Sequence, residues 1–167
     1  MNELFQTERD ARKQFLGLPL ISKKQPMATS KISYLGGLRT SAEHLASGEK
    51  ITTDAPIDNN GKGEAFSPTD LAATSLGSCA MTIMGIVAER EAIQLEGSMV
   101  EVTKTMSTDS PRRIVKIEVR FTLHTPEPLT EVQQKKLENA AHTCPVAHSL
   151  HPAIEQVFQF AWVTSAS

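Results

Sequence analysis

The chain has 167 residues, which corresponds to about one domain. Its contents of 40% hydrophobic and 22% charged residues are typical of a folded domain, and exclude a disordered or collagen-like chain. The formal net charge of −2 argues against a protein that coats nucleic acid, because such a protein needs a strongly basic surface.

The N-terminal segment differs in character from the rest of the chain. Residues 1–26 are expected to form an extension and linker, and residues 27–167 the folded domain. Charged residues between Glu3 and Lys13 interrupt every apolar stretch, so the segment does not have the pattern of a signal peptide. We therefore expect a cytoplasmic protein, in a reducing compartment where a permanent disulfide is not expected.

Three short strands are expected after the extension, because polar and apolar residues alternate there between glycine-containing turns. They cover residues 31–35, 38–45 and 50–53. The glycine-rich segment 56–63 follows, and it lacks the Gly-Lys-Ser/Thr ending of a phosphate-binding loop. The sequence predicts a plain loop for this segment.

A long helix is predicted from Pro68 to about Arg90. Ser67 is a candidate N-cap, and Asp70 lies three residues later, as in a capping box. No charge occurs from residue 71 to residue 88, which approaches the length of a membrane span. Several Ser, Thr and Gly residues in this stretch favour a central helix packed on all sides, and we expect no membrane association.

The second half of the chain contains two more strands, two helices and a closing strand. In chain order, we expect strands at 100–106 and 114–123, a helix at 130–143, a short helix at 145–150 and a strand at 157–163. The order βββ-α-ββ-α-β predicts an α+β fold rather than a doubly wound parallel sheet.

The chain has two cysteines, Cys79 and Cys144, and each is a candidate for thiol chemistry or for an inert place in the core. Cys144 precedes Pro145 and is the expected N-cap of the short helix, where the helix dipole favours a thiolate. Cys79 has no basic residue within a turn of its own helix. By this local argument Cys144 is the more acidic thiol, and Cys79 needs a cation from elsewhere.

Two other types of site are possible for these cysteines. Cys144 with His142, His148 and His151 could supply four metal ligands, but the spacing matches no zinc-binding pattern. The Ser78-Cys79 pair is faintly similar to a papain-like protease, in which the nucleophile must begin a helix. Cys79 is expected about three turns inside its helix, so this alternative is disfavoured.

The motifs around both cysteines resemble one family. They are Gly36-Gly37-Leu38-Arg39-Thr40, Gly61-Lys62-Gly63, Ser67-Pro68-Thr69-Asp70-Leu71-Ala72-Ala73 leading to Gly77-Ser78-Cys79, and Cys144-Pro145-Val146. From about residue 30 to residue 163, the chain resembles the OsmC/Ohr family of osmotically inducible and organic hydroperoxide resistance proteins.

The resemblance implies an OsmC-like fold, in an intertwined homodimer whose central helices pack between antiparallel sheets. It also implies thiol-dependent reduction of organic hydroperoxides and, more weakly, of hydrogen peroxide. Cys79 would be the peroxidatic thiol, Cys144 the resolving thiol, and Arg39 the cation that activates the Cys79 thiolate. The implied reductant is an external dithiol, in the family often a lipoylated protein, and no metal or bound cofactor is expected.

The chain departs from the family pattern beside the predicted N-cap. The best-studied peroxidases of the family carry a glutamate, paired with the arginine, at the position of Thr69. Asp70 is therefore a possible partner for Arg39, and the chain looks closer to the OsmC-like branch than to the Ohr branch. The alternative function is a dimeric OsmC-like module that binds an apolar ligand or a partner with little turnover.

Overall fold

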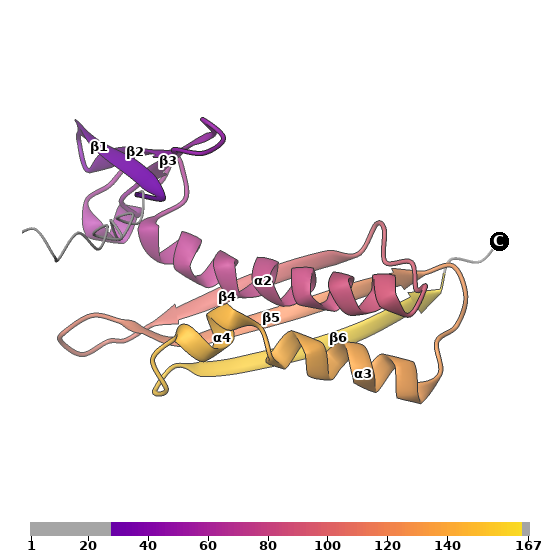
Figure 1. Ribbon diagram of the computed structural model, residues 1–167. Helices are drawn as coiled ribbons and strands as arrows, with labels where there is room; N and C mark the ends of the chain where they lie inside the picture. The colour runs from indigo at the N-terminus through magenta and orange to yellow at the C-terminus, as the bar shows by residue number, and fades with distance from the viewer. Residues whose placement is uncertain (1–27, 165–167) are drawn as a thin grey trace, which may run out of the picture.

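The computed structural model describes residues 28–164, and the predicted extension at residues 1–26 lies outside this range. Its first part is a three-stranded antiparallel sheet in the order β1-β2-β3 (Figure 1). The strands are β1 (Ser30–Gly36), β2 (Arg39–His44) and β3 (Lys50–Asp54), which confirms the three predicted strands. A short 3₁₀ helix, η1 (Ile57–Asn59), lies in the predicted loop that follows.

The long helix α2 (Pro68–Arg90) begins at the predicted cap. The Asp70 N–H donates to Ser67 Oγ at 3.1 Å, and the Ser67 N–H donates to Asp70 Oδ2 at 2.7 Å, which completes the capping box. Among the described helices, α2 alone has the length and apolar composition of a membrane span. One stripe of α2 is buried in the domain, as in a core helix: Ala73, Leu76, Gly77, Ala80, Met84 and Ala88.

The second sheet has the order β4-β5-β6, with strands β4 (Met99–Met106), β5 (Ile114–Thr125) and β6 (Glu155–Thr164). Strands β4 and β5 form the predicted antiparallel hairpin, but β6 pairs with β5 in parallel. The predicted α+β fold is confirmed, but the expected antiparallel pairing holds in this sheet only for β4 with β5. Helices α3 (Glu131–His142) and α4 (Pro145–Ser149) return the chain to the starting end of β5, as a parallel connection requires.

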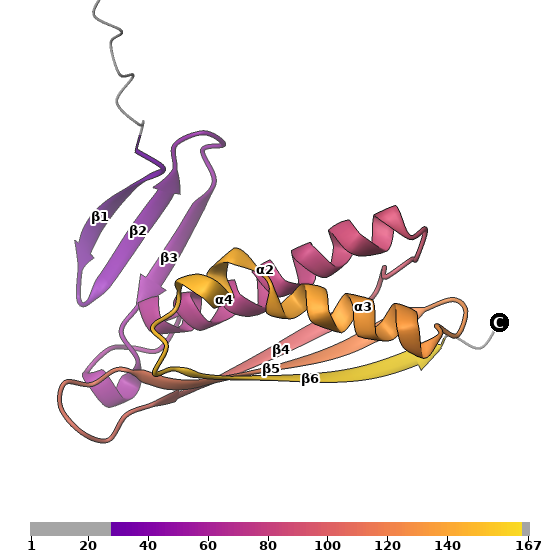
Figure 2. The same ribbon diagram turned by 60° about the horizontal axis from the view of Figure 1, so that its bottom comes forward.

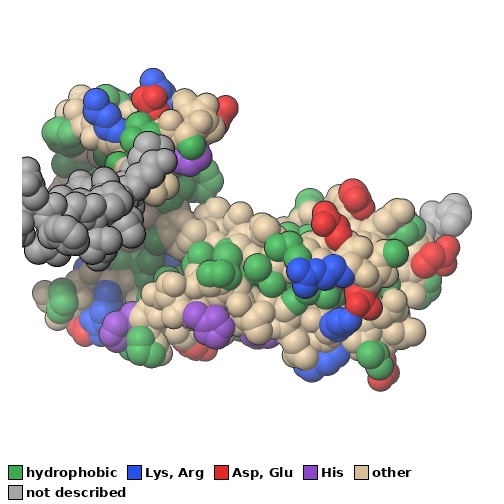
Figure 3. Space-filling model, in the orientation of Figure 1, with side chains coloured by type: hydrophobic (Ala, Val, Ile, Leu, Met, Phe, Trp, Pro, Cys, Tyr) green, Lys and Arg blue, Asp and Glu red, His purple; other side chains and the backbone are tan. Residues whose placement is uncertain are grey.

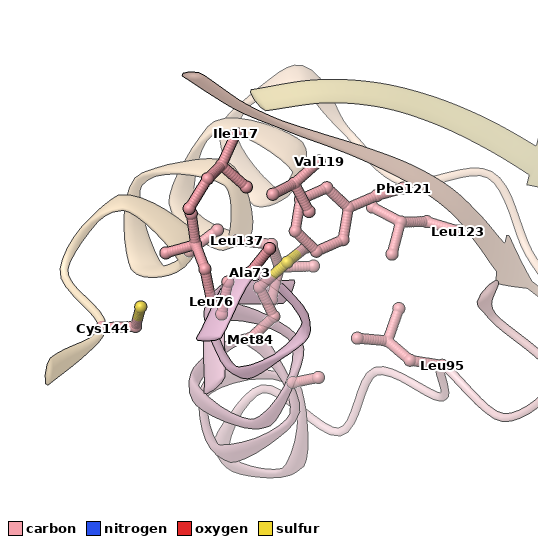
Figure 4. Packing of buried hydrophobic residues seen from close by; sticks show 13 residues of the cluster. Ala73, Leu76, Met84, Leu95, Ile117, Val119, Phe121, Leu123, Leu137 and Cys144 are labelled. Carbon is pink, nitrogen blue, oxygen red and sulfur yellow. The ribbon is translucent and has the colours of Figure 1, made fainter. Parts of the chain in front are cut away.

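Helices α2, α3 and α4 lie on one face of the second sheet (Figure 2). Strand β5 supplies the centre of the core with Ile117, Val119, Phe121 and Leu123, each at most 1% exposed. In Figure 4 these side chains lie opposite Leu76 and Met84 of α2, and Cys144 lies at the edge of the same cluster. The core therefore fixes α2 and the start of α4 on one rigid sheet.

The first sheet stands at the N-terminal end of α2, apart from the second sheet (Figures 1 and 2). Its register places Ile32, Tyr34 and Ile51 on the same face, where they are 66%, 68% and 51% exposed. Apolar side chains are also visible along the surface over α2 (Figure 3), where Ile86 is 40% exposed. The prediction of a helix packed on all sides is therefore wrong for a single chain, because its core covers only one stripe of α2.

Gly77 allows α2 to lie close to β4. A Cβ atom at this position would lie 2.6 Å from Val102 Cγ2 and 3.2 Å from Val100 Cγ1. We expect Gly77→Ala to lower the free energy of unfolding by about 1–2 kcal/mol, because overpacking outweighs the better helix propensity of alanine. Urea unfolding at one fixed protein concentration measures the change.

The matched control is Gly85→Ala in the same helix, where a Cβ atom meets nothing within 4 Å. This variant is expected to gain up to about 1 kcal/mol from helix propensity. Equal changes in the two variants would contradict the assigned close approach at Gly77.

Candidate functional site

The two cysteines lie next to each other on neighbouring helices. Cys79 is the twelfth residue of α2, and Cys144 is the N-cap of α4, as predicted. Both are free thiols; Cys144 is fully buried, whereas Cys79 is half-buried. The packing of α4 against α2 brings the thiols into contact, although 64 residues separate them in the chain.

The surroundings of Cys144 disfavour its thiolate form. Burial raises the pKa of the Cys144 thiol, and the neighbouring Cys79 thiol raises it further. The Ala147 N–H donates to Cys144 Sγ at 3.3 Å, and this helix-capping bond opposes the rise without cancelling it. The expectation that the N-cap favours a Cys144 thiolate is not supported, because desolvation by the core outweighs the N-cap of a five-residue helix.

Arg39 begins β2 and forms ion pairs with two carboxylates of its own chain. Its Nε lies 3.7 Å from Asp54 Oδ2, and its Nη2 lies 3.1 Å from Glu64 Oε2. In the described part of one chain, Arg39 forms no hydrogen bond or ion pair with Cys79. Cys79 lies about 16 Å along the helix axis from Pro68, whereas Arg39 lies in the sheet that stands apart at that end.

Asp70 is occupied by other partners. Its Oδ2 accepts the Ser67 N–H of the capping box, and its Oδ1 forms an ion pair with Lys104 of β4. Burial raises the pKa of Asp70, but the hydrogen bonds from Lys104 and Ser67 outweigh burial, and the pKa lies below its ordinary value. Within a single chain, Asp70 is therefore not the partner of Arg39, contrary to the expectation.

The sequence analysis did not identify the carboxylates that Arg39 does contact, Asp54 and Glu64. A signal for Asp54 is the hairpin itself, because an antiparallel β2–β3 register pairs Arg39 directly with Asp54. No comparable signal exists for Glu64, which follows the irregular loop after β3.

The alternative metal site has no counterpart in residues 28–164, where no three His, Cys, Asp or Glu side chains come together as ligands. His142 instead packs against the Phe158 ring, with ring centroids 4.5 Å apart. The papain-like alternative fails on position, because Cys79 lies in the middle of α2 rather than at its start.

Comparison with known proteins identifies the family that the sequence motifs resemble. A family model described as OsmC-like protein matches residues 61–157. A solved structure from Psychrobacter arcticus, of a candidate osmotic stress induced and detoxification response protein, is 51% identical, with a TM-score of 0.78. The match covers 82% of this chain and 98% of that one. No curated protein sequence matches this chain.

Two more distant solved structures share the fold. The organic hydroperoxide resistance protein OsmC of Legionella pneumophila is 20% identical with a TM-score of 0.61, over 81% of this chain and 98% of that one. An organic hydroperoxide resistance protein from Elizabethkingia anophelis is 16% identical with a TM-score of 0.61, over 83% of this chain and 99% of that one.

Proposed function

Because the chain belongs to the family of OsmC-like proteins, we propose that it is a thiol-dependent peroxidase that reduces organic hydroperoxides. The observation that supports this proposal most directly is the contact between a half-buried Cys79 and a fully buried Cys144. A peroxide can approach the first thiol, and the second is held where it can condense with an oxidised Cys79.

In the proposed first step, the Cys79 thiolate attacks the distal oxygen of the hydroperoxide. The O–O bond breaks, and Cys79 becomes a sulfenic acid while the alkoxide leaves and takes up a proton as the alcohol. The thiolate needs a cation for this step, and we assign that role to Arg39, whose guanidinium stays charged when partly buried. Its planar fork of donors can hold the thiolate and orient the peroxide.

In the proposed second step, the Cys144 sulfur attacks the sulfur of the Cys79 sulfenic acid. A Cys79–Cys144 disulfide forms and water leaves. An external dithiol then reduces the disulfide to two thiols and becomes a disulfide itself, and a lipoylated protein is one candidate for this reductant. No metal or bound cofactor takes part in this cycle, and a reducing compartment such as the cytoplasm suits it.

The experiment that tests this function is stopped-flow measurement of thiol loss. One equivalent of cumene hydroperoxide is expected to consume both thiols of the reduced protein and to leave an intramolecular disulfide. Hydrogen peroxide is expected to react more slowly. If an excess of both peroxides leaves the two thiols free, the protein is not a peroxidase.

We further propose that the active unit is an intertwined homodimer. The face of the first sheet that carries Ile32, Tyr34 and Ile51 is apolar and exposed, and it has no packing layer within the described chain. The free surface of α2 is apolar as well. Packing the sheet of each chain on the helix of the other buries both surfaces at once. In this dimer we assign the activating role to Arg39 of the partner subunit, because Arg39 does not pair with Cys79 within one chain.

Light scattering is expected to give the mass of a dimer at micromolar concentration, with well over ~2,000 Å² buried between the subunits. Ile32→Glu is expected to weaken the dimer and to slow peroxide reduction, because it places a charge in the proposed interface. The matched control is Lys31→Glu, since Lys31 is exposed and points to the opposite face of the same strand. A monomeric parent protein would contradict the proposed assembly.

A second candidate function is the binding of an apolar ligand with little turnover. The observation that favours it is a cleft of about 740 Å³ between the first sheet, the start of α2 and the β4–β5 hairpin. Tyr34, Leu38, Pro56 and Met106 contribute apolar side chains to its walls. The thiol-loss experiment separates the two functions, because a binding module would leave both cysteines reduced.

A further inference from the structure

The Arg39 guanidinium lies between two carboxylates that differ sharply in their surroundings. The Asp54 side chain is fully buried, whereas the Glu64 side chain is 58% exposed. Asp54 faces the Nε side of the guanidinium, and Glu64 contacts Nη2. The start of α2 supplies neither of them, because Asp70 binds Lys104 and the Thr69 hydroxyl bonds to Ser67 Oγ at 3.0 Å.

Asp54 is held firmly as an anion by the loop that follows β3. The Glu64 N–H donates to Asp54 Oδ2 at 3.0 Å, and this bond is the main reason that the pKa of Asp54 lies below its ordinary value. The Lys62 and Ala55 N–H groups and the Arg39 charge lower it further, against the effect of burial.

The same loop is tightly folded around Asp54. The Gly63 N–H donates to the Ala55 carbonyl at 3.2 Å, and the Gly61 N–H donates to the Pro56 carbonyl at 3.0 Å. A Cβ atom on Gly61 would lie 1.7 Å from the Ala55 carbonyl oxygen, so no larger residue fits this loop. Asp54 therefore presents a fixed negative charge to Arg39, the first residue of β2.

The contact between Arg39 and Asp54 is incomplete. Arg39 Nε and Asp54 Oδ1 are both buried, and neither has a hydrogen-bond partner within residues 28–164. The two side chains thus attract each other at 3.7 Å without a hydrogen bond, and a small turn of the guanidinium would form one. By contrast, an ion pair as exposed as Arg39–Glu64 is typically worth only about 0–1 kcal/mol and is readily exchanged.

We propose that Asp54 is the positioning residue that holds Arg39 for the Cys79 thiolate, and that Glu64 occupies the Nη2 side until the thiolate replaces it. This inference rests on the proposed function, in which Arg39 activates Cys79. Arg39 needs a carboxylate that holds it in place, and the start of α2 offers none that is free. Asp54, at the end of β3, takes this role instead. Arg39 Nε stays beside Asp54 throughout the reaction. Only the exposed Arg39–Glu64 ion pair is broken, when the thiolate takes the place of Glu64.

The test uses the full chain in a Cys144→Ser background, in which Cys79 is the only thiol. Ultraviolet absorbance gives the pH midpoint at which Cys79 ionises, and stopped-flow measurement gives the rate of its oxidation by cumene hydroperoxide. Asp54→Asn is expected to raise the midpoint by about one pH unit and to slow oxidation roughly 10- to 100-fold, because Arg39 loses its anchor. Glu64→Gln is expected to lower the midpoint, because the thiolate then competes with no carboxylate for Nη2.

The test is decisive because the two variants are expected to shift the ionisation midpoint of Cys79 in opposite directions. If Asp54 acted only through its own charge, its removal would lower the midpoint just as Glu64→Gln does, and a merely structural role would leave the midpoint unchanged. Either result overturns the inference. If Asp54→Asn does not fold, Glu64→Gln still has to lower the midpoint, and an unchanged midpoint overturns the assigned exchange.

An Arg39→Ala variant separates this inference from the proposed function. With Arg39 absent, Asp54→Asn is expected to have no additional effect on the ionisation midpoint or on the oxidation rate. If Arg39→Ala alone leaves both quantities at their parent values, Arg39 does not activate Cys79, and that part of the proposed function fails. If Arg39→Ala slows oxidation while Asp54→Asn does not, only the positioning role of Asp54 fails.

Discussion

Cys79→Ser is expected to abolish hydroperoxide reduction, with a fall in rate of at least roughly a thousandfold. A serine hydroxyl is a far weaker nucleophile at neutral pH than a thiolate and cannot form a sulfenic acid. Consumption of cumene hydroperoxide in the presence of a dithiol measures the loss. The substitution is nearly isosteric and half-buried, so circular dichroism is expected to show an unchanged fold.

Cys144→Ser is the matched control, because it removes the other thiol of the same pair. This variant is expected to consume one equivalent of peroxide in a first turnover and to accumulate a Cys79 sulfenic acid that dimedone traps. If Cys144→Ser loses the first turnover and Cys79→Ser keeps it, the roles of the two cysteines are the reverse of those proposed.

The pH dependence of disulfide formation in the parent protein provides a further expected result. The pKa of Cys144 lies above its ordinary value because the thiol is buried, so its thiolate fraction is small at neutral pH and rises with pH. Condensation with the Cys79 sulfenic acid is therefore expected to become faster as the pH is raised through the neutral range. A rate that falls with pH would contradict attack by a deprotonated Cys144.

Arg39→Ala is expected to produce the second largest effect, a fall of roughly 100-fold or more in the rate of Cys79 oxidation. The proposed site then lacks the one permanent cation assigned to the thiolate. Arg39→Lys is expected to be affected less, because lysine keeps the charge but not the planar fork of donors.

The control for Arg39→Ala is Arg113→Ala. Arg113 forms an exposed ion pair with Asp109 in the hairpin turn, and its removal is expected to leave the rate unchanged. If both Arg39 variants oxidise at the parent rate, another group activates Cys79.

Mixing a Cys79→Ser chain with an Arg39→Ala chain tests the dimer, because a site built across the interface is expected to regain activity in the heterodimer.

Local sequence patterns were sufficient for almost all of the secondary structure. Ser67 with Asp70 places the start of α2 correctly, because a capping box depends only on residues three apart. The N-cap position of Cys144 follows for the same reason, since Pro145 suits only the first turn of a helix. The alternating strands also lie within a few residues of their predicted bounds.

The tertiary structure alone decided the features that depend on contacts between distant segments. The parallel pairing of β6 with β5 depends on where α3 and α4 return the chain, and no strand pattern records that path. The raised pKa of Cys144 arises from burial in the core, which outweighs the local capping bond. Likewise, Asp70 pairs with Lys104 because β4 packs beside the start of α2.

The sequence by itself therefore determined the helices and strands and their caps, because these depend on short-range spacing. It also identified the two thiols, because the family resemblance is carried by contiguous motifs around each cysteine. It did not determine the neighbours of Arg39, because β3 and an irregular loop bring Asp54 and Glu64 to it. Charge–charge interactions act through space, and the distance between two charges is set by the packing of the whole chain. For that reason the tertiary structure alone revealed that the Asp54 carboxylate is buried beside Arg39 and that Glu64 contacts the same guanidinium.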